Sequence, residues 1–116
     1  MKNLPFYRRM RFAIKGIVAA FRTERSFRTQ SLFGSGALGL LFWYRAGGEW
    51  VALFVLTIGG VLAAELFNTA LENALDHLSP EKHPAMEVAK DCAAGAVFVL
   101  SLTSLAVLLA FLFSRG

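Results

Sequence analysis

Three carboxylates and one amide recur along a short stretch of the chain, at Glu65, Asn68, Glu72 and Asp76. On an α-helix, which turns by about 100° per residue, Glu72 and Asp76 lie about 20° to either side of Glu65, and Asn68 lies about 60° away. All four side chains therefore share one helix face. Carboxylates can hold Mg²⁺ against phosphate oxygens, and a carboxylate can also accept a hydroxyl proton. The spacing thus indicates a site suited to phosphoryl transfer.

These side chains differ in their expected depth in a membrane. Glu65 directly follows an uncharged run, Trp50 to Ala64, and ionisable groups at membrane depth are functional candidates by default. Glu65 and Glu72 are about 10 Å apart along a regular helix, so they cannot both bind one ion. We interpret Glu65 as a base near a lipid hydroxyl and Glu72 as a metal ligand near a soluble cosubstrate. A solvated face just beyond the membrane edge accounts equally well for Asp76.

Other polar residues have both a functional and a structural interpretation. Lys90 and Asp91 open the third apolar stretch, where the lysine can pair with a phosphate or simply reach the membrane interface beside a helix-start acid. Glu24 is the one acid of the basic N-terminal region, and it can form a local ion pair with Arg25 or Arg28. No GxxxxGK(S/T) phosphate loop occurs, so a nucleotide site must be built differently.

The elements that position these residues are expected to lie in a membrane. The 116 residues are 56% hydrophobic and 17% charged, whereas soluble domains are about 45–50% apolar and about 25% charged. Eight of the twelve basic residues lie in the first 28 positions, which predicts a cytoplasmic N-terminus. Because this basic segment leads straight into apolar spans, we do not expect a nucleic-acid partner. The single cysteine, Cys92, excludes an internal disulfide.

The apolar stretches predict an all-α integral membrane protein of one domain, residues 1–116. Transmembrane helices are expected at about 29–47, 50–70 and 91–113, with a cytoplasmic extension and loop at about 71–90. Residues 1–28 form the basic segment. Within it, apolar residues from Phe6 to Phe21 recur at three- and four-residue spacing, which predicts an amphipathic helix on the inner membrane surface.

The polar residues also resemble those of a known family. The pattern Glu65-x-x-Asn68-x-x-x-Glu72-x-x-x-Asp76 is followed by Glu81-x-His83-Pro84 and then by Ala89-Lys90-Asp91, and it is preceded by the segment Thr23 to Arg28. Together these resemble the prokaryotic diacylglycerol kinase / undecaprenol kinase family over nearly the whole chain. The resemblance implies a homotrimer of three-span protomers, each with an N-terminal surface helix. It also implies active sites between protomers at the cytoplasmic edge of the bacterial inner (plasma) membrane.

The resemblance further implies a role for each matching residue. Glu65 is the expected catalytic base on the lipid hydroxyl, and Glu24 and Glu72 are expected to hold the Mg²⁺ that bridges the phosphates of ATP. Asn68 is expected to assist catalysis, with Asp76 supporting the site. Phe27, Arg28 and the surface helix are expected to line the lipid entry. The residues expected to contact the nucleotide are Glu24, Glu72, Glu81, His83, Lys90 and Asp91.

The lipid substrate is inferred from departures within the family pattern. Gln30 stands where diacylglycerol-type members carry a glutamate, and the His83-Pro84 loop is more similar to that of undecaprenol kinases of Gram-positive bacteria. We therefore expect an ATP-dependent kinase that converts undecaprenol to undecaprenyl phosphate. The alternatives are a diacylglycerol kinase that makes phosphatidic acid, and a non-enzymatic membrane protein or transporter subunit that uses Glu65 as a proton site.

Overall fold

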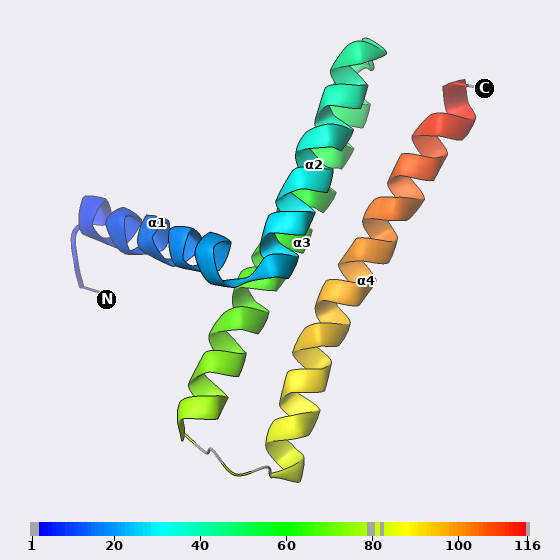
Figure 1. The fold of residues 1–116 in the computed structure, drawn as a ribbon. Helices are drawn as coiled ribbons and strands as arrows, with labels where there is room; N and C mark the ends of the chain where they lie inside the picture. Colours follow the sequence, from blue (N-terminus) through cyan, green and yellow to red (C-terminus); the bar gives the residue numbers. More distant parts are fainter. Residues whose placement is uncertain (1–2, 79–80, 82, 116) are drawn as a thin grey trace.

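The computed structural model describes residues 3–78, 81 and 83–115, which form four helices. These are α1 (Phe6–Thr23), α2 (Arg25–Trp43), α3 (Gly48–Leu78) and α4 (Pro84–Arg115). The helices α2, α3 and α4 run side by side as a bundle, and α1 projects sideways from it (Figure 1). The predicted all-α architecture is confirmed for the described part of the chain.

Two of the helices, α3 and α4, are long and apolar enough to cross a membrane. With 31 and 32 residues they extend over about 46–48 Å, compared with about 30 Å for a hydrocarbon core. The expected division into a span and a polar extension thus falls within one continuous helix, α3, which carries all four polar positions of the acidic face. Residues 79, 80 and 82 of the predicted cytoplasmic loop lie outside the described residues.

The core of the bundle lies at the end remote from these acids. Phe111 of α4 is fully buried, and the rings of Tyr44, Trp50 and Phe54 approach it edge-on with centroid distances of 6.1, 5.3 and 5.9 Å. Such edge-on aromatic contacts contribute stabilisation beyond that from the apolar area that the rings bury. Tyr44 lies at the end of α2, Trp50 and Phe54 lie in α3, and Phe111 lies in α4. The cluster therefore joins all three helices.

The helix α2 overlaps the span expected at about 29–47, but it begins and ends four residues earlier. It ends in a turn in which Arg45 has a φ of 53°, and the N–H of Ala46 donates to the carbonyl of Leu41 at 2.9 Å. This hydrogen bond satisfies a carbonyl that the end of a helix leaves without a partner. The turn reverses the chain, so that α3 packs along α2.

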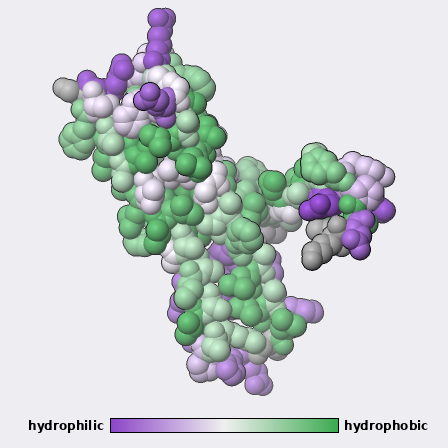
Figure 2. Space-filling model, turned by 180° about the vertical axis from the view of Figure 1, so that it is seen from behind, coloured by the Kyte–Doolittle hydropathy of each residue, from purple (hydrophilic) through white to green (hydrophobic). Residues whose placement is uncertain are grey.

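The first helix, α1, has the predicted amphipathic character but little contact with the rest of the chain. Ala20 is its one buried residue, whereas Phe6, Ile14 and Phe21 are about half exposed or more. Figure 2 shows hydrophobic surface over much of the bundle and hydrophilic residues at its two ends and on the projecting helix. This pattern suits a bundle surrounded by apolar material with α1 at its boundary.

Candidate functional site

Glu65 is the one buried charged residue in the described part of the chain, with 4% of its surface exposed. It lies in the middle of α3, on the stripe that also buries Phe54 and Val61. The hydroxyl of Ser26, in the first turn of α2, donates to Glu65 Oε1 at 2.7 Å. Burying a carboxylate without a donor is costly, so this hydrogen bond helps to stabilise Glu65 in an apolar bundle.

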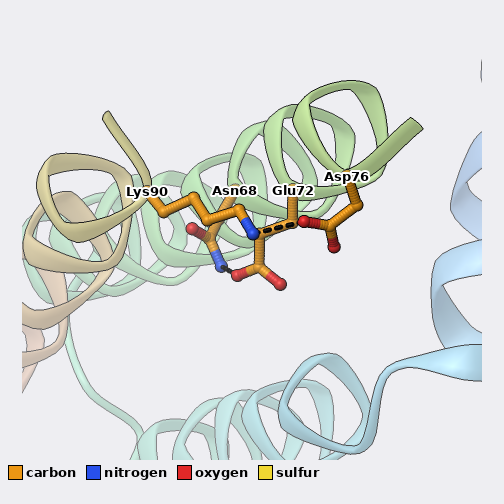
Figure 3. A network of polar contacts seen from close by, with 4 residues as sticks. All are labelled: Asn68, Glu72, Asp76 and Lys90. Carbon is orange, nitrogen blue, oxygen red and sulfur yellow. Dashed lines mark hydrogen bonds and ion pairs between the residues drawn. The ribbon is translucent and has the colours of Figure 1, made fainter. Parts of the chain in front are cut away.

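Asn68 and Glu72 form the next layer of the site along α3. One turn separates them, and Asn68 Nδ2 donates to Glu72 Oε1 at 2.8 Å (Figure 3). The other amide atom, Asn68 Oδ1, is buried and has no hydrogen-bond donor among the described residues. Buried polar atoms in native proteins are almost always paired, so this oxygen is available to a donor or a cation that the chain does not supply.

Asp76 and Lys90 link the two longest helices at the polar end of the site. Lys90 reaches from α4 to form an ion pair with Asp76 of α3, close to Glu72 (Figure 3). Lys90 lies before the apolar run of α4, and the hydrogen bond with Asp76 raises its pKa above the ordinary value, with the charges of Glu72 and Glu87 acting in the same direction. A cation is therefore held beside the acidic face.

Glu24 lies at the junction between α1 and α2, and its backbone ends the first helix and begins the second. The hydrogen bonds of the described residues join Glu72 to Asn68 and not to Glu24. Phe27 is buried against the ring of Phe21, at 6.4 Å between centroids. Arg28 donates to two carbonyl oxygens at the end of α1, those of Phe21 and Arg22, at 2.8 and 3.0 Å.

The remaining predicted nucleotide residues lie near the α3–α4 connection. His83 precedes Pro84 at the start of α4, and its Nδ1 accepts a hydrogen bond from the N–H of Ala85 at 3.1 Å, so the ring caps the helix. Glu81 and Asp91 are exposed. These residues follow the polar end of α3 or lie near the start of α4, and the hydrogen bond of His83 to Ala85 is local to α4.

Shallow cavities flank the acidic face on both sides. One, of about 430 Å³, lies between α1 and α3 and is lined by small residues of both helices, including Gly16, Ala20 and Ala70. Another, of about 280 Å³, lies between α3 and α4 and includes Asn68 among its lining residues. Of the acidic face, only Asn68 lines one of these two cavities, the one between α3 and α4.

The donor set of this face fits a magnesium ion. Mg²⁺ prefers oxygen ligands: Glu72 supplies carboxylate oxygens, and Asn68, whose Nδ2 is bonded to Glu72, supplies Oδ1, which has no partner among the described residues. The described residues contain no group of three or more His, Cys, Asp or Glu side chains that could hold a metal. Mg²⁺ does not require such a group, because it usually binds one or two carboxylates together with phosphate oxygens and waters.

Two polar contacts made by α2 were not expected from the sequence. Ser26 meets Glu65 across 39 positions of the chain, and Gln30, one turn further along α2, donates to the hydroxyl of Ser101 in α4 at 3.3 Å. The available signal was weak: Ser26 and Gln30 lie four residues apart, but other polar residues surround them at the start of α2. Their partners depend on how α2 packs against α3 and α4.

Comparisons with known proteins find related sequences over most of this chain. Residues 11–112 match the family described as prokaryotic diacylglycerol kinase. The undecaprenol kinase of Bacillus subtilis is 38% identical over 100 residues, covering 85% of this chain and 80% of the relative. The diacylglycerol kinase of Synechocystis is 35% identical, covering 84% of this chain and 56% of the relative. The diacylglycerol kinase of Pseudomonas aeruginosa is 33% identical, covering 76% and 72%.

Proposed function

This chain belongs to the prokaryotic diacylglycerol kinase family and is an ATP-dependent lipid kinase, and we propose that its preferred substrate is undecaprenol, which it converts to undecaprenyl phosphate. Diacylglycerol, which would give phosphatidic acid, is the alternative. The undecaprenol kinase of Bacillus subtilis supports the first substrate, since it is 38% identical and both chains are covered to 80% or more. Gln30 also supports undecaprenol, because this chain carries a neutral amide at the position where diacylglycerol-type members carry a glutamate.

The observation that carries the proposal is the buried carboxylate of Glu65 in a membrane protein. Glu65 is buried on an apolar helix, where water is scarce, and the proposal requires a lipid hydroxyl to reach it there. In the proposed reaction its carboxylate accepts the proton of the lipid hydroxyl while the hydroxyl oxygen attacks the γ-phosphorus of ATP, and ADP leaves. Asn68 lies one turn from Glu65 and assists at the reacting centre.

The nucleotide end of the site is proposed to lie two turns further along α3. Glu72, oriented by Asn68, would hold Mg²⁺ together with Glu24, and the ion when bound supplies charge neutralisation at the phosphates. Lys90 contributes a positive charge beside Glu72. Its ion pair with Asp76 is exposed, with 62% of the Asp76 side chain accessible, and exposed pairs stabilise proteins little. Lys90 can therefore exchange Asp76 for a phosphate oxygen.

Further residues complete the proposed site. Glu81, His83 and Asp91 would contact the nucleotide from the α3–α4 connection. Phe27 and Arg28 would border the lipid entry beside α1, and their contacts with the end of that helix support this, because they join the surface helix to the base-bearing bundle. The cavity between α1 and α3 gives a lipid a route along the same side.

We further propose three transmembrane spans per protomer, with the N-terminus and active site on the cytoplasmic face of the bacterial inner membrane. The helix α2 supports this proposal, because it lies along α3 with 19 residues, about the length that a span requires. A homotrimer is proposed because the resemblance of the sequence to the family implies one. Cross-linking in native membranes tests the trimer.

A direct kinase assay tests the function. The purified protein in detergent micelles is incubated with labelled ATP, Mg²⁺ and either undecaprenol or diacylglycerol. We expect label in both lipid products, with the higher kcat/KM for undecaprenol. Label in neither lipid would contradict the kinase assignment for this chain, and equal kcat/KM values would contradict the preference for undecaprenol.

A second experiment tests the roles of the two glutamates. Glu65→Gln should abolish turnover while leaving Mg·ATP binding intact, and Glu72→Gln should weaken Mg·ATP binding. Glu49→Gln, in the first turn of α3 at the opposite end of the helix, is the matched control and should change neither. Equal loss of Mg·ATP binding in the Glu65 and Glu72 variants would show that the two carboxylates do not have separate roles.

A further inference from the structure

The side chain of Ser26 forms a hydrogen bond that neither the sequence pattern nor the family match assigns. Its hydroxyl donates to Glu65 Oε1 at 2.7 Å, and Glu65 is the one buried charged residue among those described. We propose that Ser26 is the positioning residue for the catalytic base: it holds one carboxylate oxygen of Glu65 and directs the other toward the lipid hydroxyl. This proposal rests on the proposed role of Glu65.

The chemistry of the carboxylate explains why such a residue is useful. A glutamate side chain has three rotatable bonds, so a base that is not held samples many orientations. Fixing the Oε1 atom leaves Oε2 as the oxygen that can accept a proton. Proton transfer requires a heavy-atom distance of about 2.6–3.2 Å, and small errors in placement reduce rates strongly. One hydrogen bond from α2 therefore selects the productive orientation.

The two residues that follow Ser26 are held against the end of α1. Ser26 lies in the first turn of α2, where the next residue, Phe27, is buried against a ring of α1. Arg28 donates to two carbonyl oxygens at the end of α1, at 2.8 and 3.0 Å. These contacts fix the start of α2 relative to α1, and the hydroxyl of Ser26 transfers that placement to Glu65. A residue that positions a catalytic group must itself be held in place, and Ser26 meets this requirement.

A purely structural role is the rival explanation. In that case the Ser26–Glu65 hydrogen bond would only help α2 to pack on α3, and its loss would lower thermal stability while kcat stayed the same. The two explanations separate in the kinetic constants. Positioning the base affects a transition-state interaction and so changes kcat, whereas the affinity for Mg·ATP, bound about two turns away, stays the same.

The experiment compares three variants of α2 in the lipid kinase assay. Ser26→Ala removes the donor, and Ser26→Thr keeps a hydroxyl at an exposed position that has room for the extra methyl group. Ser35→Ala is the matched control, because it removes an exposed hydroxyl elsewhere on α2. We expect Ser26→Ala to lower kcat by about ten- to a hundredfold with the KM for Mg·ATP unchanged. Ser26→Thr should restore most of kcat, and Ser35→Ala should match the wild type.

Two results would overturn the inference. One is a wild-type kcat in Ser26→Ala. The other is a loss in Ser26→Ala that Ser26→Thr fails to restore and that a fall in the thermal unfolding temperature accompanies. The Glu65→Gln variant, assayed in parallel, separates this failure from that of the proposed function: if Glu65→Gln retains turnover, the base itself is wrongly assigned, whatever Ser26 does.

Discussion

Among the glycines of the described residues, Gly34 of α2 has the least room for a side chain. A Cβ atom added there would lie 2.7 Å from Cγ2 of Ile58 in α3, whereas ordinary contacts begin at 3.4 Å. Gly34→Ala therefore requires a movement of about 0.7 Å, the difference between these two distances. The Cγ2 methyl group of Ile58 cannot rotate away, because isoleucine is β-branched and such a side chain in a helix is nearly restricted to one χ1 rotamer. The helices must separate instead.

The cost of this separation can be estimated. Overpacking of this kind costs about 1–3 kcal/mol. Alanine also favours a helix over glycine by about 1 kcal/mol, which offsets part of the cost. Gly36→Ala is the matched control, because it gains the same helix propensity and its Cβ would meet nothing within 4 Å. We expect Gly34→Ala to be about 1–3 kcal/mol less stable than Gly36→Ala.

The assay is reversible unfolding of the purified protein in mixed detergent micelles, read as a free energy of unfolding. Adding Ile58→Ala removes the obstructing methyl group, so the two substitutions together should cost less than the sum of each alone. Turnover should fall with stability in Gly34→Ala, because a 0.7 Å displacement of α2 would weaken the 2.7 Å hydrogen bond between Ser26 and Glu65. Equal stability of Gly34→Ala and Gly36→Ala would refute this account of the α2–α3 contact.

Three further substitutions probe other contacts. Phe111→Ala removes the fully buried centre of the aromatic cluster and should lower the free energy of unfolding by about 3–5 kcal/mol, whereas Phe113→Ala, at an 82% exposed position, should change it little in the same assay. Arg28→Lys removes the planar group that donates to the end of α1, so hydrogen exchange at the last turn of α1 should become faster; unchanged exchange would show that this contact does not hold the helix. Lys90→Met should raise the KM for Mg·ATP by about tenfold, through loss of a charge-assisted hydrogen bond to phosphate, and more than Asp76→Asn does; an equal effect of both would show that Lys90 serves only its ion pair.

Much of the architecture followed from local patterns in the sequence. Runs of apolar residues indicated helices at membrane length, and a spacing of 3.6 residues placed Glu65, Glu72 and Asp76 on one face. The amphipathic pattern before residue 22 indicated a separate amphipathic helix, which is α1. These features could be predicted because a helix face depends on sequence spacing alone, whatever packs against it.

The boundaries of the elements were less predictable. The sequence placed the end of the second span near residue 70, with a polar extension beyond it, and α3 runs unbroken through both to Leu78. Hydropathy changes at a membrane edge, whereas the hydrogen bonds of a helix do not depend on what surrounds it. At the other end of the bundle, α2 ends where hydrogen bonds of the turn at Arg45 satisfy its last carbonyl groups. The composition of the sequence does not predict this end point.

The partners of the acidic face were decided by tertiary structure. The sequence by itself determined that Glu65 is a carboxylate within an apolar helix and that Asn68 and Glu72 share its face. Only the packing of α2 on α3 brought Ser26 to Glu65 across 39 positions. The packing of α4 on α3 brought Lys90 to Asp76 across 14 positions. Periodicity defines which side chains share a face, but the helix that covers that face is selected by the fit of side chains distant in the sequence.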